Sequence, residues 1–357
     1  MNNYKILTLA CVTTLFTACN DKKNTPDLIV NFDTTLLKNS YQSGEKIDLK
    51  VIAPENKTID SVQYFLNDVK ITSSKGANPD SYTLENVKFG ARILKSLAYI
   101  DGKSYESSLE IKILPKDAPE IWSYGIINTF DHDQTAYTQG LEFYGGNLIE
   151  STGNGAGASG KRGKSSIRKV DPRTGAVLKK VELDDSIFGE GATVLNNKIY
   201  QLTYKNNEAY VYNAETLEKE ATLPYFKNME GWGLTNDGTY LYMTDGTDKL
   251  YKINPKDFSL VEELYIATER GTVPTINELE WVNGKIYANF YGTDLIGVID
   301  PTTGRVEAVI DFKGLKTDLN DHIDQDVFNG IAYNRATDTF FVTGKNWDKI
   351  FEVRINK

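Results

Sequence analysis

TQGLEF (138–143) recurs in four variant forms along the chain, as GEGATV (189–194), EGWGLT (230–235), INELEW (276–281) and FNGIAY (328–333). Each copy places a polar or acidic residue beside Gly or Leu and continues through an apolar run into a turn. The copies lie roughly 40 to 50 residues apart, a period typical of β-propellers, in which each repeat forms one small sheet. The repeats therefore predict an all-β fold built around a five-bladed propeller.

The unit that begins at Glu190 shows why these copies must pack together. Its segments IYQLTY (199–204) and AYVYN (209–213) alternate apolar with polar residues, and Asn-rich turns separate them. A sheet of three or four such short strands cannot bury its own faces, so neighbouring copies must stack to close a core. The turns DPRTG (171–175) and DPTTG (300–304) stand at one place in their units, which favours repeated hairpins.

The fifth unit ends at Lys357 after three predicted strands. The segment EIWSYGIINTF (120–130) has the β-branched and aromatic content of a strand but no hairpin partner of its own. An open propeller would expose two sheet edges. We therefore expect residues 120–130 to complete the last blade and close the ring.

Composition narrows the class of protein. The chain has 357 residues, 40 % of them hydrophobic and 11 % aromatic, which suits a β-rich protein with an ample core and more than one domain. Its net charge of −9 argues against a nucleic acid as partner.

The first nineteen residues are predicted to be a targeting sequence. Lys5 precedes an apolar run, and LFTAC (15–19) resembles the processing site of bacterial lipoproteins, with Cys19 as the lipidated residue. An ordinary cleaved signal peptide is the alternative. Residues 20–27 are polar and contain proline, as a tether would. This predicts a protein of the bacterial cell envelope, periplasmic or at the outer-membrane surface, that touches the membrane through its lipid anchor only.

Residues 28–114 contain no copy of the repeat. They show about seven short strand patterns separated by turns, which predicts a small immunoglobulin-like β-sandwich without a disulfide. Two prolines in ILPKDAPEIW (113–122) mark the boundary, and the propeller is expected over 118–357. No cluster of catalytic side chains appears before this boundary, so a spacer role is favoured for the sandwich.

The repeated stretches bring polar residues to one end of a propeller channel. Nearby carboxylates in a partly desolvated channel mouth raise one another's pKa, so that a glutamate can shuttle protons near neutral pH. Alternatively, such residues bond the backbone of the next blade. The candidates are Gln139, Glu142, Glu190, Glu230, Trp232, Asn277, Glu278, Glu280 and Asn329.

The ordered set TQGLEF, FGEG, IYQLTYK, EGWGLT, INELEW, NGIAY and TGKNW resembles the plant-type and bacterial glutaminyl-peptide cyclotransferases. The resemblance runs from about residue 129 to the C-terminus, with motifs in every repeat. It implies a five-bladed propeller that converts an N-terminal glutamine of peptides or proteins to pyroglutamate and releases ammonia. It also implies no required cofactor, and a monomer is expected.

Site residues follow from this resemblance. Glu190 of FGEG matches the catalytic glutamate, and Lys345 of TGKNW matches an active-site lysine suited to stabilise negative charge. Gln139 and Asn277 match polar substrate-binding positions, and Trp232 matches an aromatic wall. The remaining implied pocket residues are Tyr204, Tyr291, Tyr137 and Phe188. From the residues alone, the aromatic side chains could equally pack between blades, and Lys345 could be a solvated turn lysine.

Other signals are weaker. The Gly-rich segment 153–166 lacks the spacing of a phosphate-binding loop and is interpreted as a flexible surface loop. DLNDHIDQD (318–326) lacks the glycine and closing glutamate of a calcium loop. With two histidines and no cysteine after processing, no metal ligand set is predicted, although a structural calcium in the channel stays open. The alternative functions are a calcium-dependent lactonase or esterase of the propeller type, and a non-enzymatic surface lipoprotein that binds peptide or glycan.

Overall fold

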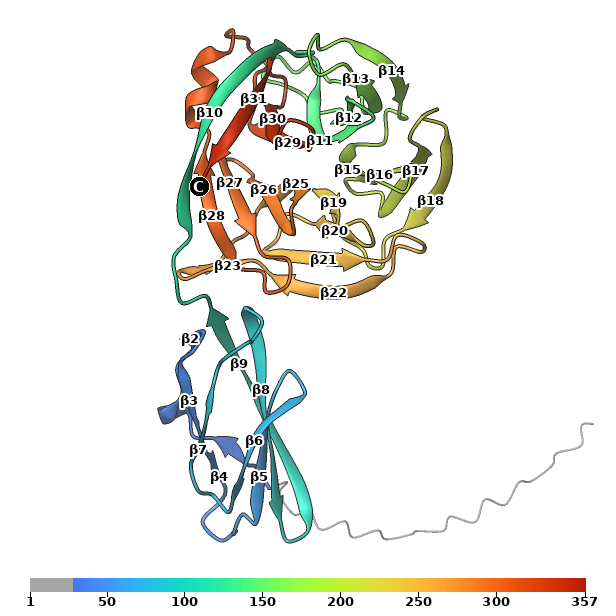
Figure 1. Cartoon of the computed structure of the whole chain (residues 1–357). Coiled ribbons are helices and arrows are strands. Elements are labelled where there is room, and N and C mark those ends of the chain that lie inside the picture. Colours follow the sequence, from blue (N-terminus) through green and yellow to red (C-terminus); the bar gives the residue numbers. More distant parts are fainter. Residues whose placement is uncertain (1–27) are drawn as a thin grey trace, which may run out of the picture.

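The computed structural model describes residues 28–357, so the predicted targeting sequence, Cys19 and the tether lie outside the described residues. Strands are the main elements of the described chain, which forms two parts joined by residues 115–119, as Figure 1 shows for the connection between the smaller part and the ring. A ring of sheets contains residues 120–357, and a smaller part contains residues 28–114.

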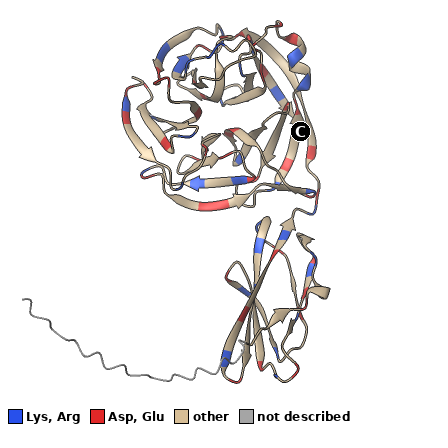
Figure 2. Cartoon of the chain, turned by 180° about the vertical axis from the view of Figure 1, so that it is seen from behind, with Lys and Arg blue, Asp and Glu red and all other residues tan. Residues whose placement is uncertain are grey.

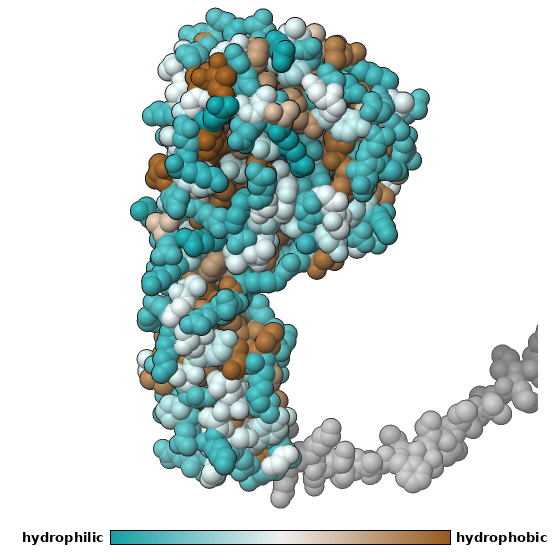
Figure 3. All heavy atoms as spheres, in the orientation of Figure 1, coloured by the Kyte–Doolittle hydropathy of each residue, from teal (hydrophilic) through white to brown (hydrophobic). Residues whose placement is uncertain are grey.

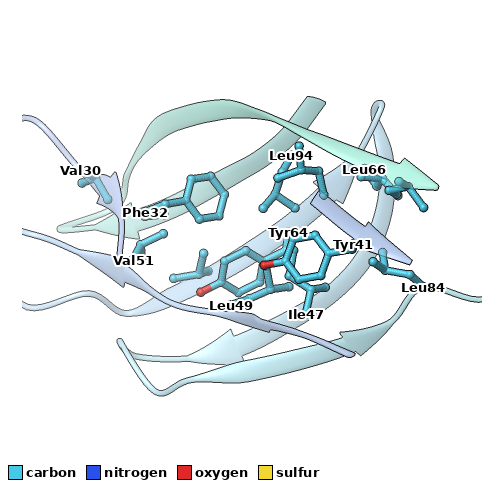
Figure 4. Close-up of a cluster of buried hydrophobic side chains, with 14 of the residues drawn as sticks. Val30, Phe32, Tyr41, Ile47, Leu49, Val51, Tyr64, Leu66, Leu84 and Leu94 are labelled. Carbon is cyan, nitrogen blue, oxygen red and sulfur yellow. The ribbon is translucent and has the colours of Figure 1, made fainter. Parts of the chain in front are cut away.

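The smaller part has its own apolar core. Its long strands alternate buried and more exposed residues, because successive side chains of a strand point to opposite faces. The buried side chains lie between the strands, as Figure 4 shows for Phe32, Tyr64 and Leu94. Its elements are β1 (Asn31–Phe32), η1 (Thr34–Leu36), β2 (Ser40–Gln42), β3 (Lys46–Leu49), β4 (Val51–Ile52), β5 (Ser61–Leu66), β6 (Val69–Lys75), β7 (Asp80–Thr83), β8 (Gly90–Ile100) and β9 (Lys103–Leu114).

The strands of this part form one main sheet and two small pairs. The main sheet has the order β2-β9-β8-β5-β6, while β3 pairs with β7 and β1 with β4. Residues 46–52 thus form two strands, β3 and β4, with different partners. The break between them falls at Lys50, whose carbonyl accepts the N–H of Asp33. The immunoglobulin-like topology stays a prediction.

The ring contains three separate four-stranded sheets and one eight-stranded sheet. The first separate sheet consists of β11 (Tyr137–Tyr144), β12 (Asn147–Gly153), β13 (Ser166–Val170) and β14 (Val177–Glu182). The second consists of β15 (Gly189–Leu195), β16 (Lys198–Thr203), β17 (Glu208–Asn213) and β18 (Lys219–Pro224). The third consists of β19 (Leu234–Asn236), β20 (Leu241–Thr244), β21 (Lys249–Ile253) and β22 (Leu260–Tyr265).

The eight-stranded sheet has two halves of four strands. One half is β25 (Ile276–Val282), β26 (Lys285–Phe290), β27 (Leu295–Ile299) and β28 (Val306–Asp311), and the other is β29 (Phe328–Asn334), β30 (Thr339–Gly344), β31 (Lys349–Asn356) and β10 (Glu120–Asp131). The short hairpin β23 (Ala267–Thr268) and β24 (Gly271–Thr272) and the 3-10 helix η2 (Lys313–Asp318) lie between sheets in the sequence.

The prediction that residues 120–130 join the fifth repeat is confirmed. Strand β10 pairs antiparallel with the C-terminal strand β31 along most of its length, and its first three residues pair in parallel with β28. This second pairing fuses the two halves into one eight-stranded sheet. Figure 1 shows β10 running along the outside of the ring from the smaller part.

Four of the repeated stretches lie in the innermost strand of their group, at the centre of the ring, and the third, residues 230–235, enters its inner strand β19 only at Leu234 (Figure 1). These inner strands are buried almost throughout, whereas the outer strands β14 and β18 are mostly exposed. Apolar clusters join neighbouring groups, as in the core shared by Leu202 and Leu234. The repeats therefore bury their faces against each other, as their short strands require.

The two parts touch where β8 meets β22. The ammonium of Lys88 pairs with Glu262, and the guanidinium of Arg92 lies 5.7 Å from the ring centre of Tyr265. Figure 2 shows acidic and basic residues interspersed over both parts. The face in Figure 3 is mainly polar, with separated apolar patches.

Candidate active site

The inner strands carry β-bulges where the repeated stretches lie. Pairing shifts between Thr138 and Gly140 in β11, and between Gly189 and Ala192 in β15. A bulge adds a residue to one strand and redirects its side chain, and bulges are common beside active sites. Strands β25 and β29 are interrupted in the same way. The residues at these interruptions include Gln139, Glu190, Asn277 and Asn329.

Glycines in the repeats allow the inner strands to approach each other at the ring centre. A Cβ on Gly191 would lie 2.5 Å from the carbonyl oxygen of Trp232, which accepts the Gly191 N–H at 2.7 Å. A Cβ on Gly233 would collide with the carbonyl of Asn277 in the next group. The glycine of the repeat is therefore a requirement of close backbone packing.

A pocket of about 290 Å³ lies at one end of the ring centre. Its lining consists of Tyr137, Gln139, Phe188, Glu190, Tyr204, Trp232, Asn277, Tyr291 and Lys345. These are the nine residues that the sequence nominated for catalysis and substrate binding. The structure therefore brings all of them together, from all five groups of strands and the turns beside them.

Glu190 is the buried acid of this pocket. It is 5 % exposed, and its carboxylate accepts no hydrogen bond from any residue of 28–357. Burial raises the pKa of Glu190 well above its usual value, the cation of Lys345 opposes this rise, and Glu230 adds to it. An acid with a raised pKa and no protein partner can exchange a proton with a ligand.

Lys345 faces the same pocket from the turn between β30 and β31. It is 3 % exposed, and its Nζ lies 5.0 Å and 4.9 Å from the ring centres of Tyr137 and Tyr291. Burial lowers the pKa of Lys345, and the nearby Glu190 and Asp326 partly oppose this change. The side chain thus supplies a desolvated positive charge held between two aromatic faces.

Aromatic side chains form the walls. Phe188 packs edge-on against Tyr137 with ring centres 6.0 Å apart, and it contacts Tyr204 on its other side at 5.7 Å. Across the pocket, Trp232 packs edge-on against Tyr291 at 5.4 Å. These rings contact each other and also line the cavity, so packing and pocket roles coexist.

Polar amides complete the lining. Asn329 Nδ2 donates to Gln139 Oε1 at 3.4 Å and to the carbonyl of Thr138 at 3.0 Å. The second amide, Asn277, is 2 % exposed, and its Oδ1 is buried without a partner among the described residues. A buried acceptor without a partner costs free energy, so it is a ready partner for an N–H of a ligand.

The other acidic residues of the repeats bond the backbone of other groups instead. Glu278 accepts the N–H groups of Leu141 and Ile331 at 3.2 Å and 2.9 Å. Glu280 accepts the N–H of Tyr333 at 3.0 Å, and Glu142 accepts that of Val194 at 2.8 Å. These three carboxylates do not line the pocket, and Glu230 pairs with Lys205 near it at 3.2 Å.

Sequence reasoning missed Asp326, which supports a pocket wall. The hydroxyl of Tyr137 donates to Asp326 Oδ2 at 2.8 Å, although the two residues are 189 positions apart. The Gly-rich segment also packs against this wall. Gly155 contacts the Tyr137 ring so closely that a Cβ would collide with it, and Ser159 N–H donates to Asp324 at 2.7 Å. The interpretation as a flexible surface loop stays a prediction, and these contacts tie Gly155 and Ser159 to the residues of the pocket wall.

No three His, Cys, Asp or Glu side chains within residues 28–357 converge as metal ligands. The helices of the described chain are too short or too polar to span a bilayer.

An all-β ring with a buried acid and a buried lysine at its centre defines a propeller-like protein with a polar pocket. A family model described as glutamine cyclotransferase matches residues 97–355, beginning upstream of the predicted boundary at 118. A glutaminyl-peptide cyclotransferase of Arabidopsis thaliana is 35 % identical over 72 % of this chain and 77 % of its own length. The crystal structure of Myxococcus xanthus glutaminyl cyclase is similar, with a TM-score of 0.61 and 32 % identity over 67 % of this chain and 98 % of that one.

The chain therefore belongs to the glutamine cyclotransferase family.

Proposed function

We propose that this protein is a glutaminyl-peptide cyclotransferase, which converts an N-terminal glutamine of a peptide or protein to pyroglutamate and releases ammonia. Family membership supports the reaction. The pocket supports it too, because the carboxylate of Glu190 and the ammonium of Lys345 both lie there without a hydrogen-bond partner from residues 28–357. That pairing of an acid and a cation is the observation that carries the proposal.

The reaction is an intramolecular acyl transfer. The free α-amine of the substrate attacks the carbonyl carbon of its own side-chain amide, and a new C–N bond forms in a tetrahedral intermediate. The bond to the amide nitrogen then breaks. One proton must pass from the attacking amine to the departing nitrogen, so that ammonia leaves as a neutral molecule.

Glu190 is suited to carry that proton. Its ionised form accepts a proton from the attacking amine, and its acid form then donates it to the leaving nitrogen. Because its pKa is raised well above the usual value, both forms are accessible nearer to neutral pH. A correctly placed acid-base group is typically worth ~10² to 10⁴ in rate.

Lys345 is suited to stabilise the oxygen that becomes negative in the intermediate. Its charge is desolvated, so it acts more strongly than in water. The unpartnered Oδ1 of Asn277 would accept an N–H of the substrate, and Gln139 would bind a further polar group. The aromatic walls would hold the methylene groups of the folded glutamine side chain.

The size of the pocket fits a substrate bound by its end. A volume of about 290 Å³ is at the lower limit for small-molecule sites and holds one folded side chain. The rest of a peptide would extend past the rim.

We further infer that the five groups of four strands are the five blades of a propeller, and that residues 28–114 are a spacer of immunoglobulin-like type. Lipidation at Cys19 would hold a monomeric enzyme at the bacterial cell envelope, with no nucleic-acid partner. No cofactor is required in this proposal. Adding a chelator to the activity assay tests for a structural calcium.

The direct test is ammonia release from a Gln-initiated dipeptide by the purified protein. The matched control is the same dipeptide with its α-amine acetylated, which cannot cyclise. Release from the free dipeptide alone is expected. No release would reject the proposal, and binding without release would favour the non-enzymatic alternative. Loss of activity with a chelator would instead indicate a metal requirement.

A further inference from the structure

A buried ionic cluster lies beside the pocket and takes no part in the proposed chemistry. It contains His132, Asp133, Glu150 and Arg168. His132 follows β10, Glu150 lies on β12 and Arg168 on β13. His132, Glu150 and Arg168 are all less than 9 % exposed. Burying several charges costs free energy unless opposite charges and hydrogen bonds compensate for the lost water.

The geometry fixes the charge of His132. Its Nδ1 lies 2.8 Å from the carbonyl oxygen of Trp347, and its Nε2 lies 3.0 Å from Glu150 Oε1. A carbonyl oxygen is only an acceptor. Burial opposes the ionised form of Glu150, but the guanidinium of Arg168, which bonds Oε2, is the largest influence that lowers the pKa of Glu150. Both ring nitrogens therefore face acceptors, and both must carry a proton.

The neighbouring charges balance this imidazolium. Arg168 Nε donates to Glu150 Oε2 at 2.9 Å, and its Nη1 donates to Asp133 Oδ2 at 2.8 Å. Two cations thus meet two anions. Burial opposes the charge on His132, but Glu150 outweighs burial and Arg168, so the pKa of His132 is raised.

The cluster holds the turn that carries Lys345. Besides the His132 contact to Trp347, the N–H of Asn346 donates to the carbonyl of Ala136 at 2.7 Å, and Asn346 Nδ2 donates to that of Gln134 at 3.1 Å. Residues 132–136 thus hold the turn through hydrogen bonds. Asn346 needs this support, because its φ of 58° is a strained left-handed conformation.

The same cluster reaches the strand that carries a second pocket residue, Gln139. The hydroxyl of Thr138 donates to Glu150 Oε1 at 2.7 Å, and Thr138 directly precedes Gln139 at the bulge of β11. Glu150 therefore contacts both His132, which holds the Lys345 turn, and the strand that presents Gln139. The Glu150 carboxylate therefore links the turn that carries Lys345 to the strand that carries Gln139.

We propose that His132 and Glu150 are positioning residues. The imidazolium of His132, bound to Glu150, fixes the position of Lys345 relative to Gln139. This inference rests on the proposed cyclotransferase function. Loss of the imidazolium removes a donor to the Trp347 carbonyl or to Glu150, which releases the turn. A displacement of about 1 Å at a catalytic group can cost ~10²-fold in rate.

The sign of the pH effect follows from the raised pKa. The imidazolium supports the turn fully below the ordinary value of 6.5, and the support is lost as pH rises through the raised value in the folded protein. The groups that face the ring are Glu150 from β12, Arg168 from β13 and the uncharged Trp347 carbonyl from the turn. Asp133 reaches the ring only through Arg168.

The first experiment reads the charge directly, by NMR of the full chain with ¹⁵N-labelled histidine. The chain has two histidines, so the spectrum of His322→Gln assigns the signal of His132. Two protonated ring nitrogens are expected at pH 6.5, the ordinary pKa of histidine, because the pKa of His132 is raised. A neutral ring at that pH would overturn the proposal, whether or not the protein releases ammonia.

The second experiment compares kinetics of His132→Gln and Thr138→Val with His322→Gln as the matched control. We expect kcat of His132→Gln to fall by about 10- to 100-fold, with KM changed by less than about threefold. The ratio of wild-type to variant kcat should shrink as pH rises through the pKa of His132. A ratio that is constant with pH would indicate a merely structural role and overturn the proposal.

Thr138→Val guards against a variant that fails to fold. Valine keeps the shape of threonine and removes only the hydroxyl that donates to Glu150. A fall in kcat of roughly 3- to 10-fold, with an unchanged thermal midpoint, is expected. Unchanged kcat would remove Glu150 from the proposal. If wild type releases no ammonia, the proposed function fails, and the NMR result still decides the charge of His132.

Discussion

Glu190 and Glu278 are two buried acids on inner strands of the same ring, and they differ in their partners. Burial raises the pKa of both well above the usual value. Glu278 accepts two backbone N–H groups from other strands, whereas Glu190 accepts none among the described residues and faces the pocket. Residue type and burial are therefore alike for the two acids, and their hydrogen-bond partners distinguish Glu278 from Glu190, the proposed acid-base group.

The strongest test of this contrast is Glu190→Gln. The amide keeps the size of the side chain but cannot shuttle a proton, so we expect kcat for ammonia release to fall by about 10²- to 10⁴-fold. The thermal midpoint should stay close to that of wild type, because no protein hydrogen bond is lost. An active variant would show that Glu190 is not the acid-base group.

Lys345→Met tests the other half of the pocket. Removing the cation should lower kcat by about 10²- to 10³-fold, by analogy with the loss of one oxyanion donor. It should also move the acidic limb of the pH profile upward, because Lys345 holds down the pKa of Glu190. An unmoved limb in any residual activity would contradict the coupling of the two groups.

Glu278→Ala should give the reverse pattern. It leaves the N–H groups of Leu141 and Ile331 buried without an acceptor, so the free energy of unfolding should fall by about 2–4 kcal/mol. The kcat of the folded fraction should fall far less than in Glu190→Gln. Urea unfolding measures the first quantity, and ammonia release below the unfolding transition measures the second. A variant as stable as wild type would remove the distinction.

The smallest expected effect concerns Glu142, whose pKa burial raises to about 7. Its contribution to stability is fully present below the ordinary value of 4.5 and is lost as pH rises through about 7. Glu142→Gln keeps an oxygen for Thr193 and Val194 but has no charge to bury. At pH 8 its free energy of unfolding should exceed that of wild type by about 1–3 kcal/mol, and at pH 4.5 the two should agree.

The repeated stretches made the ring and its pocket predictable, because four of the five supply a pocket residue within six positions and four of the five contain a glycine. Glu190 and Trp232 could be found in this way. The bulges that redirect Gln139 and Asn277 could not, since they depend on the partner strand.

Long-range contacts were also invisible in the sequence. Asp326 meets Tyr137 across 189 positions, and His132 meets Trp347 across 215. Neither pair leaves a local pattern. The three parallel pairs between β10 and β28 that merge the last groups were equally hidden, because the sequence predicted only that residues 120–130 complete the last blade.

The closing strand also constrains how the molecule is made. Strand β10 lies near the start of the ring sequence, but Ser123 pairs with Asn356 at the very C-terminus. At synthesis rates of about 5–20 residues per second, roughly 10–50 s pass between the synthesis of β10 and that of its partner β31. The antiparallel partner of β10 is thus among the last strands of the ring to be synthesised, so the ring can close only late in synthesis.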